Sequence, residues 1–246
     1  MDLGLFVLPL ATFVTSALTG IVGMGGGLLL LLVMSAYLPF AVLIPVHGIN
    51  QLVTHFSRAT ISLLEIDYRL AARFAVGAIL GAAVGTKFVP SISEEVFKLA
   101  LGAFVLACLI QPKLKLKINL GTLYKWPIVG ALTSFCGMFV GATGVLIAPF
   151  FLNEKLNKEQ LVATKAACQV FIHSSKVVAF FVLGFALGPY LVLIILMCLM
   201  SAIGSIFAKH TLKKIPEKQF YILFQVIIII LAIRLVFIGV KGIVST

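Results

Sequence analysis

Long uncharged stretches dominate the pattern of hydrophobic and polar positions along this chain. No lysine, arginine or glutamate occurs between residues 2 and 40, and no charged residue occurs at 126–153 or 177–208. A helix needs about 20 mostly apolar residues to cross a bilayer. Apolar runs of about this length predict membrane-spanning helices near 41–62, 68–88, 94–111, 158–183, 189–209 and 217–239.

Two further apolar segments, 3–38 and 126–152, contain glycine clusters in their middle. The first cluster reads Gly20-Ile-Val-Gly-Met-Gly-Gly-Gly27, and the second reads Gly137-Met-Phe-Val-Gly141-Ala-Thr-Gly144. Each glycine weakens a helix by about 1 kcal/mol relative to alanine. We therefore expect each segment to break into two shorter pieces that form a hairpin.

The composition excludes a soluble domain. Hydrophobic residues make up 61% of the 246 residues and charged residues only 11%, and the mean hydropathy is +1.18. A water-soluble fold of this size cannot bury so much apolar surface, so the surroundings are a lipid bilayer. The net charge of +11 does not indicate nucleic acid, because the basic residues fall in short loops between apolar spans.

The positions of the basic residues predict the topology. Short loops rich in lysine and arginine face the cytoplasm. The larger group of basic residues is therefore assigned to the cytoplasmic side and consists of Arg69, Arg73, Lys113, Lys115, Lys117, Lys125, Lys155, Lys158, Lys209, Lys213, Lys214 and Lys218. The smaller group falls on the outer side and consists of Lys87, Lys98, Arg234 and Lys241. This division requires segment 126–152 to begin and end on the cytoplasmic side, so the segment must turn back on itself.

The resulting fold is an all-α polytopic membrane protein with two inverted-topology repeats. Residues 1–112 form the first repeat, with hairpin 3–38 and the three helices that follow it. A basic cytoplasmic linker, 113–125, leads to the second repeat, 126–246, with hairpin 126–152 and its own three helices. A hairpin and three helices make an odd number of crossings, so the second repeat is upside down, as in many secondary carriers.

A polar motif occurs once in each repeat, inside otherwise apolar helices. At a constant offset of 118 residues, Gln169, His173, Ser175 and Lys176 match Gln51, His55, Ser57 and Arg58. Polar and basic side chains are costly in a bilayer and by default mark a functional site. We therefore expect one site that is shared between the two repeats.

The helical period places each copy of the motif on one face of its helix. Inversion then brings His47 and Lys176 toward the outer side and Arg58 and Lys165 toward the inner side, with the glutamines and histidines between them. No aspartate or glutamate lies inside a span. The column has positive charge at both ends and neutral donors in the middle, which favours a small anion over a cation.

Glycine turns would add backbone donors to this column, because a helix N-terminus with free N–H groups is an anion site. The turns Gly25–Gly27 and Gly141–Gly144 each open a short helix. The complete candidate substrate-binding set is Gln51, His55, Ser57, Arg58, Lys165, Gln169, His173, Ser175, Lys176, His47, Asn50, Gly25, Gly26, Gly27, Thr143 and Gly144.

The cysteines leave one alternative open. Cys108, Cys136, Cys168 and Cys198 are scattered without metal-ligand or CxxC spacing, and no Walker A pattern is present. We expect no metal, no cofactor and no direct use of ATP. An intramembrane enzyme or sulfur-transfer protein would use Cys168 as nucleophile and His173 as base. A membrane scaffold is a further alternative, but it leaves the duplicated polar motif unexplained.

The chain resembles the TauE/SafE sulfite exporter family, also called TSUP (4-toluene sulfonate uptake permeases). The resemblance rests on the turn Gly20-x-x-Gly23-x-Gly-Gly-Gly27, on the less complete glycine turn in the second half and on the duplicated layout. The resemblance covers nearly the whole chain. It implies a multi-pass carrier of the bacterial inner membrane that exports sulfite or a related small sulfur anion by alternating access. Uptake of thiosulfate or an organosulfonate is the alternative. Two departures are the incomplete glycine run at Val140–Thr143 and the unequal pair His47 and Lys165.

The topology can be tested by labelling from each side of the membrane. We expect Lys115→Cys and Leu212→Cys, each in a cysteine-free background, to react only with reagents that reach the cytoplasmic face, because their loops are basic. The measurement is blocking of each thiol by an impermeant maleimide in intact cells and in inverted vesicles. Labelling of position 115 from outside would contradict the inverted topology.

Overall fold

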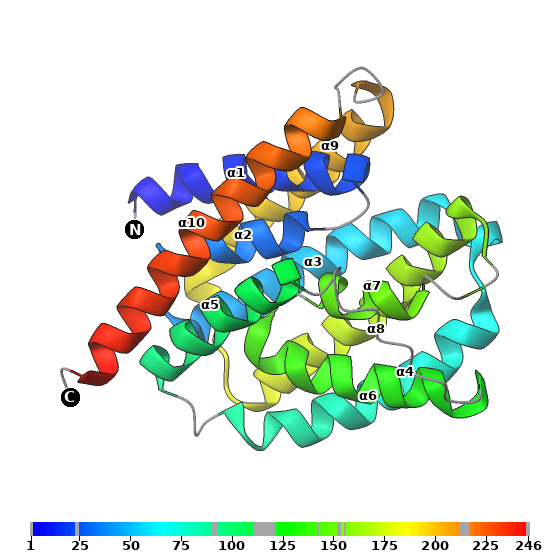
Figure 1. Ribbon diagram of the computed structural model, residues 1–246, viewed down its shortest axis with the longest axis horizontal. Coiled ribbons are helices and arrows are strands. Elements are labelled where there is room, and N and C mark those ends of the chain that lie inside the picture. Colours follow the sequence, from blue (N-terminus) through cyan, green and yellow to red (C-terminus); the bar gives the residue numbers. More distant parts are fainter. Residues whose placement is uncertain are drawn as a thin grey trace.

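Every regular element in the described part of the chain is a helix (Figure 1). The computed structural model describes residues 2–22, 25–89, 93–110, 122–141, 143–151, 154, 156–211 and 217–244. The helices are α1 (Asp2–Val22), α2 (Gly26–Met34), α3 (Phe40–Ile61), α4 (Tyr68–Thr86), α5 (Glu94–Ile110), α6 (Thr122–Val140), α7 (Gly144–Phe151), α8 (Lys158–Val182), α9 (Leu191–Thr211) and α10 (Glu217–Val244). Short 3-10 turns, η1 (Leu63–Glu65) and η4 (Gly188–Tyr190), precede α4 and α9. The all-α class is confirmed.

The long helices begin close to the residues that hydropathy predicts, and capping residues explain two of these starts. The Asp67 carboxylate accepts from the N–H of Leu70 at 3.0 Å at the start of α4. Asn157 and Gln160 form a reciprocal capping box at the start of α8. Residues 113–121 of the predicted linker lie outside the described residues, and its last residues already belong to α6.

The chain is broken at both glycine clusters. Gly25 and Gly141 have φ angles of 93° and 78°, in the left-handed region that favours glycine. One helix therefore ends and a shorter one begins at each break, giving the pairs α1–α2 and α6–α7. In α2, the leucines from Leu28 to Leu32 are all buried, so this short helix lies inside the bundle and not on its surface.

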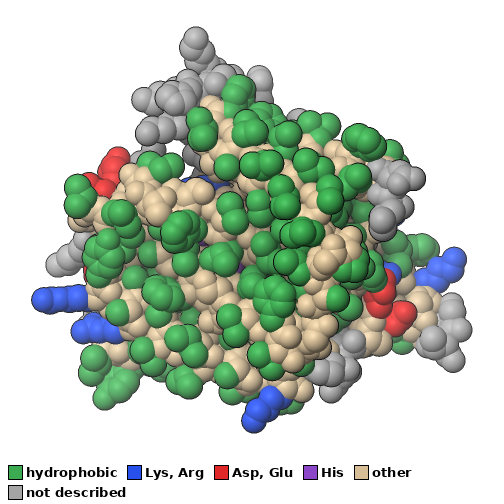
Figure 2. Space-filling model, turned by 180° about the vertical axis from the view of Figure 1, so that it is seen from behind, with side chains coloured by type: hydrophobic (Ala, Val, Ile, Leu, Met, Phe, Trp, Pro, Cys, Tyr) green, Lys and Arg blue, Asp and Glu red, His purple; other side chains and the backbone are tan. Residues whose placement is uncertain are grey.

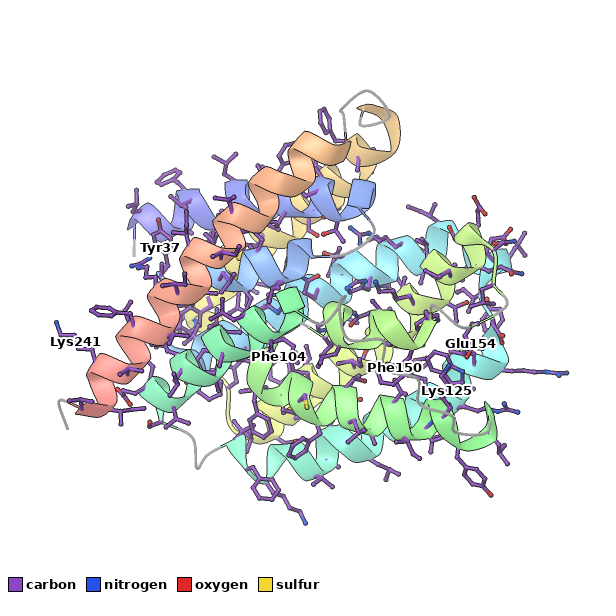
Figure 3. The ribbon with its side chains drawn as sticks, in the orientation of Figure 1. Tyr37, Phe104, Lys125, Phe150, Glu154 and Lys241 are labelled. Carbon is purple, nitrogen blue, oxygen red and sulfur yellow. The ribbon has the colours of Figure 1, made fainter. Side chains whose placement is uncertain are left out.

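Each broken segment turns back toward its own start. The Lys125 ammonium, near the start of α6, donates to the carbonyl of Phe150 at 2.9 Å and to the Glu154 carboxylate at 2.6 Å, beyond the end of α7. A methyl group at Gly4 in α1 would lie 3.5 Å from Tyr37, just after α2. Figure 3 shows Tyr37 on the left and the pair Lys125 and Glu154 on the right, so the two hairpins open toward opposite sides.

The contacts between helices repeat when the halves are exchanged. The counterparts are α1 and α6, α3 and α8, α4 and α9, and α5 and α10. The α1–α9 contact corresponds to the α6–α4 contact, and α3–α9 corresponds to α8–α4. The α3–α8 and α5–α10 contacts each map onto themselves. This is the pattern that a two-fold relation between the halves produces, and the inverted repeat relative to a membrane stays a prediction.

The surface of the bundle is largely apolar. Figure 2 shows a face covered by hydrophobic side chains, with lysine and arginine gathered at its edges. By length and composition, two helices of the described part qualify as membrane spans, Tyr68–Thr86 and Gly188–Ala208, with mean hydropathies of 1.3 and 2.7. Helices α3 and α8, which carry the duplicated polar motif, are not among these two. An apolar surface of this extent fits a lipid environment.

Glycines bring α4 and α6 into backbone contact. A methyl group at Gly77, Gly81 or Gly130 would collide with main-chain atoms of the facing helix. The pair Gly184 and Gly188 does not serve helix packing, because a methyl group at either residue would meet nothing within 4 Å among the described residues. Gly184 instead ends α8 in the left-handed conformation, with φ of 88°.

The α4–α6 contact gives a stability prediction. We expect Gly81→Leu to lower the stability of the protein by at least about 1–3 kcal/mol, because the new side chain must push two backbones apart. The control is Ala83→Leu, on the exposed face of the same helix, which should change stability by less than about 0.5 kcal/mol. Thermal unfolding in detergent measures both, and equal midpoints would contradict the close contact.

Candidate functional site

A cavity of about 40 Å³ lies where the two broken hairpins meet α3 and α8. It is larger than the ~10–15 Å³ that one water needs, so it can hold a ligand of several atoms. Residues from both halves contribute to its wall, which consists of Thr19, Gly25, Gly27, Leu28, His47, Gln51, His55, Gly141, Thr143, Gly144, Lys165, Gln169 and His173. This wall contains no carboxylate.

The two copies of the polar motif face each other on α3 and α8. His47 lies within electrostatic range of Lys176, and Arg58 lies within range of Lys165. A methyl group at Gly48 would be 3.1 Å from Cδ of Lys176. The start of α3 therefore lies beside the end of α8, and the reverse holds at the other end. Basic side chains therefore stand at both ends of the cavity region, Lys176 at one end and Arg58 with Lys165 at the other.

Histidines occupy the middle of the site. The rings of His55 and His173 stack with centroids 5.6 Å apart and an angle of 5° between their planes. The His47 ring meets His173 edge-on at 6.3 Å. The Nδ1 atoms of all three rings are buried and have no hydrogen-bond partner among the described residues. These nitrogens can therefore serve a ligand or a proton.

Thr143 orients the amide of Gln169. The hydroxyl of Thr143 donates to Oε1 of Gln169 at 2.6 Å, which identifies the oxygen end of this amide. The amide nitrogen, Nε2, is buried and has no hydrogen-bond partner among the described residues. Because Gln169 lines the cavity, its NH₂ group is a neutral donor that is available to an acceptor there.

The first half uses different contacts at the equivalent place. The Nε2–H of His47 donates to the carbonyl of Gly27 at 2.9 Å, and Gln51 Nε2 lies 3.3 Å from the same ring nitrogen. A methyl group at Gly27 would lie 2.6 Å from Gln51 Nε2, and one at Gly144 would lie 3.0 Å from Gln169 Nε2. Glycine at the start of α2 and α7 thus lets each glutamine amide approach the backbone.

Two helix N-termini meet at the cavity. Gly25, Gly27 and Leu28 line it from the start of α2, while Thr143 and Gly144 line it from the start of α7. The first N–H groups of a helix have no partner within the helix and form the positive end of its dipole. Both ends therefore favour negative charge in the cavity.

Six residues of the predicted set lie outside the wall of the cavity. Asn50 and Gly26 line a neighbouring cavity instead, and the Ser57 hydroxyl donates to the carbonyl of Val53 at 2.8 Å. Ser175 is half-buried on α8. The remaining two are the bases of the motif, Arg58 and Lys176.

These two bases bind backbone carbonyls near the cavity. Lys176 is fully buried and donates to the carbonyl of Gly141 at 3.0 Å. Arg58 donates to the carbonyl of Ser16 at 3.3 Å. Lys176 thus connects α8 to the α6–α7 break, whereas Arg58 connects α3 to α1. Their charges act on the cavity from behind its wall.

Sequence reasoning missed Thr19 and Leu28 as lining residues, whereas it placed Gly141 in a glycine turn at the site. Thr19 had a detectable signal, because Thr12, Thr15, Ser16 and Thr19 follow the i, i+3, i+4, i+7 spacing of one helical face. Leu28 is an ordinary apolar residue, and nothing in its sequence position marks it.

Comparison with known proteins identifies one family. The family model described as sulfite exporter TauE/SafE matches residues 8–235 of the chain. No curated protein and no solved structure matches the chain. The matched range contains every residue of the cavity wall.

Cys168, the proposed nucleophile of the enzymatic alternative, lies outside the cavity wall. Its side chain has 0% exposure and belongs to an apolar cluster with Ala167 and Ile172. A thiol must ionise to act as a nucleophile, and apolar surroundings oppose ionisation. This position fits packing and not catalysis.

The burial of Cys168 gives a labelling prediction. We expect N-ethylmaleimide to leave Cys168 unmodified in the folded protein and to modify it after unfolding, because the reagent cannot reach it. The half-buried Cys136 and Cys198 are internal references. Mass spectrometry of the peptides measures the modification. Rapid alkylation of Cys168 in the native state would contradict its burial and would support the alternative of an intramembrane enzyme.

Proposed function

The chain belongs to the sulfite exporter TauE/SafE family, and from that premise we propose that it is a secondary carrier of sulfite or a closely related small sulfur anion. The family consists of membrane-embedded transporters of sulfur anions. Within this class, we assign the protein to export across the bacterial inner membrane as a multi-pass carrier.

One observation carries the choice of an anion at this site. The N-termini of α2 and α7 reach the same cavity, and its wall includes Lys165 but no carboxylate. Backbone N–H groups, helix dipoles and a basic side chain all stabilise negative charge. The same groups repel a cation, so the cavity selects against one.

Some residues of the site would bind the anion directly, and others would hold the surrounding backbone in place. Gln169, through its unpaired NH₂ group, and the N–H groups at the starts of α2 and α7 would bind the oxygens of the anion. Lys165 would neutralise its charge directly. Arg58 and Lys176 would hold the backbone carbonyls of Ser16 and Gly141 and add positive potential at each end.

The same geometry supports transport by alternating access. The hairpins α1–α2 and α6–α7 open toward opposite sides, and both broken ends reach one cavity between the halves. In an inverted repeat, small movements of one half against the other expose a central site to each side in turn. We propose this arrangement of residues 1–112 and 126–246 as the basis of the cycle.

The function can be tested by binding and by counterflow. We expect Lys165→Met to weaken sulfite binding about 30-fold or more, because loss of a desolvated charge contact costs ~2–5 kcal/mol. Arg58→Met removes positive charge from behind the wall, so it should weaken binding in the same direction but by less. The control is Arg234→Met, on an exposed face of α10, which should change affinity by less than about 5-fold. Calorimetry on the purified protein measures the affinities.

Counterflow then connects binding to transport. Vesicles that contain the protein and unlabelled sulfite should accumulate labelled sulfite, and the Lys165→Met vesicles should not. Thiosulfate and sulfate as competitors would rank the related anions. Equal affinity in all three variants would contradict the site, and absence of counterflow with any sulfur oxyanion would contradict the carrier.

A further inference from the structure

Three histidines line the larger cavity, and the proposed binding of the anion does not use them. His47 and His55 come from α3, and His173 comes from α8. The rings of His55 and His173 lie parallel with centroids 5.6 Å apart, and the His47 ring lies 6.3 Å from that of His173. Histidine is the side chain whose ordinary charge change falls nearest to neutral pH, so this group can bind a proton.

Each of the three rings has a buried nitrogen without a protein partner. The Nδ1 atoms of His47, His55 and His173 have no hydrogen-bond partner among the described residues. Buried polar atoms that serve only packing are normally paired. The His47 ring is held at the start of α2 by its hydrogen bond to the carbonyl of Gly27, which leaves the stacked pair of His55 and His173 as the place for a proton.

Basic side chains face the stacked pair from both of the helices that carry it. They are His47 and Arg58 on α3, with Lys165 and Lys176 on α8. The other helices at the cavity, α1, α2, α6 and α7, contribute no titratable side chain to its wall. Like charges oppose one another in apolar surroundings, so a proton on either ring is costly while no anion is bound.

An anion in the cavity reverses this balance. Its negative charge favours the protonated form of an imidazole in the same wall. The surroundings are apolar, so this attraction is stronger than it is in water. Only one ring of the pair should gain a proton, because two neighbouring imidazolium groups repel each other. The anion and the proton therefore stabilise each other, and each raises the affinity of the site for the other by the same factor.

We propose that the stacked pair His55 and His173 binds a proton when the anion binds, so that the carrier moves the anion together with a proton. One neutral ring accepts a proton from water at its unprotonated nitrogen and becomes an imidazolium. When the anion leaves on the other side of the membrane, the ring returns this proton to the water there. The inference deepens the proposed function and rests on it, because the pair gains its proton only through the anion.

The proton also changes the charge that crosses the membrane. A dianion that moves with one proton carries a single net negative charge. An inside-negative membrane potential still drives this charge outward. The coupling is therefore compatible with export, and it lowers the charge that must pass through apolar surroundings.

The proton can be counted by calorimetry. Sulfite is titrated into the detergent-purified protein at about pH 7.5, near the ordinary range of histidine, in two buffers that differ in their heat of ionisation. The dependence of the binding heat on the buffer gives the number of protons taken up per sulfite bound. Titration of sulfite itself contributes equally to every variant, so a comparison between variants isolates the histidines.

We expect the wild-type protein to take up at least about half a proton more per sulfite than His55→Gln/His173→Gln, because the double variant lacks both rings. Its affinity for sulfite should fall about 10-fold, since one favourable charge contact is lost. The variant His55→Phe/His173→Phe keeps two rings without titratable nitrogens and should behave in the same way. The matched control is His210→Gln, near the end of α9, which should keep the wild-type uptake.

The outcomes separate the proton site from the anion site. Equal proton uptake in the wild-type protein and the two double variants overturns the proton site and leaves the anion site standing. Folded double variants that bind no sulfite also overturn it, because the rings would then be required contacts of the anion; thermal unfolding shows whether they are folded. Uptake that only the double variants lose supports the proton site. Absence of sulfite binding to the wild-type protein contradicts the proposed function, and the coupling with it.

Discussion

The arrangement of this protein depends on the burial of basic side chains in apolar surroundings. Lys176 has no exposed surface, and its ammonium donates to the carbonyl of Gly141 at the break between α6 and α7. A charge in such a place is costly unless polar groups or an opposite charge compensate it. The carbonyl compensates only in part. The remaining positive potential supports the proposal that the central cavity binds a small anion.

Broken helices supply free backbone N–H and C=O groups, which intact helices cannot. An unbroken membrane helix satisfies its own N–H and C=O groups and has none left for a ligand. The breaks at Gly25 and Gly141 release such groups at the cavity, because glycine adopts the left-handed backbone without strain. The carbonyls of Gly27, at the start of α2, and of Gly141, at the break between α6 and α7, are bound by His47 and Lys176. Side chains of the polar motif thus bind the backbone at the glycine breaks, so the two features form one site.

Periodicity and duplication in the sequence were sufficient to predict the helices, their breaks and the meeting of the two motifs on α3 and α8. They could not separate residues that line the cavity from residues that support it. Arg58 and Lys176 share the face of Gln51 and Gln169, and only the positions of the backbone carbonyls show that these bases lie behind the wall. The threonine row of α1 was visible as a pattern, but threonine is common in membrane helices, and its role depends on where each hydroxyl proton points.

The two halves also differ in how their equivalent interfaces are held. Hydroxyl contacts between Ser16, Ser201 and Ser205 join α1 to α9, and such contacts can exchange partners when the helices slide. Glycines at Gly77, Gly81 and Gly130 join α4 to α6 through backbone contact, which has no polar partners to exchange. The α1–α9 interface also contains a close backbone approach, since a methyl group at Gly204 of α9 would lie 2.5 Å from the carbonyl oxygen of Phe13 in α1. Its additional hydroxyl contacts can re-form after a small shift, so we expect relative motion of the halves to be easier at α1 and α9 than at α4 and α6.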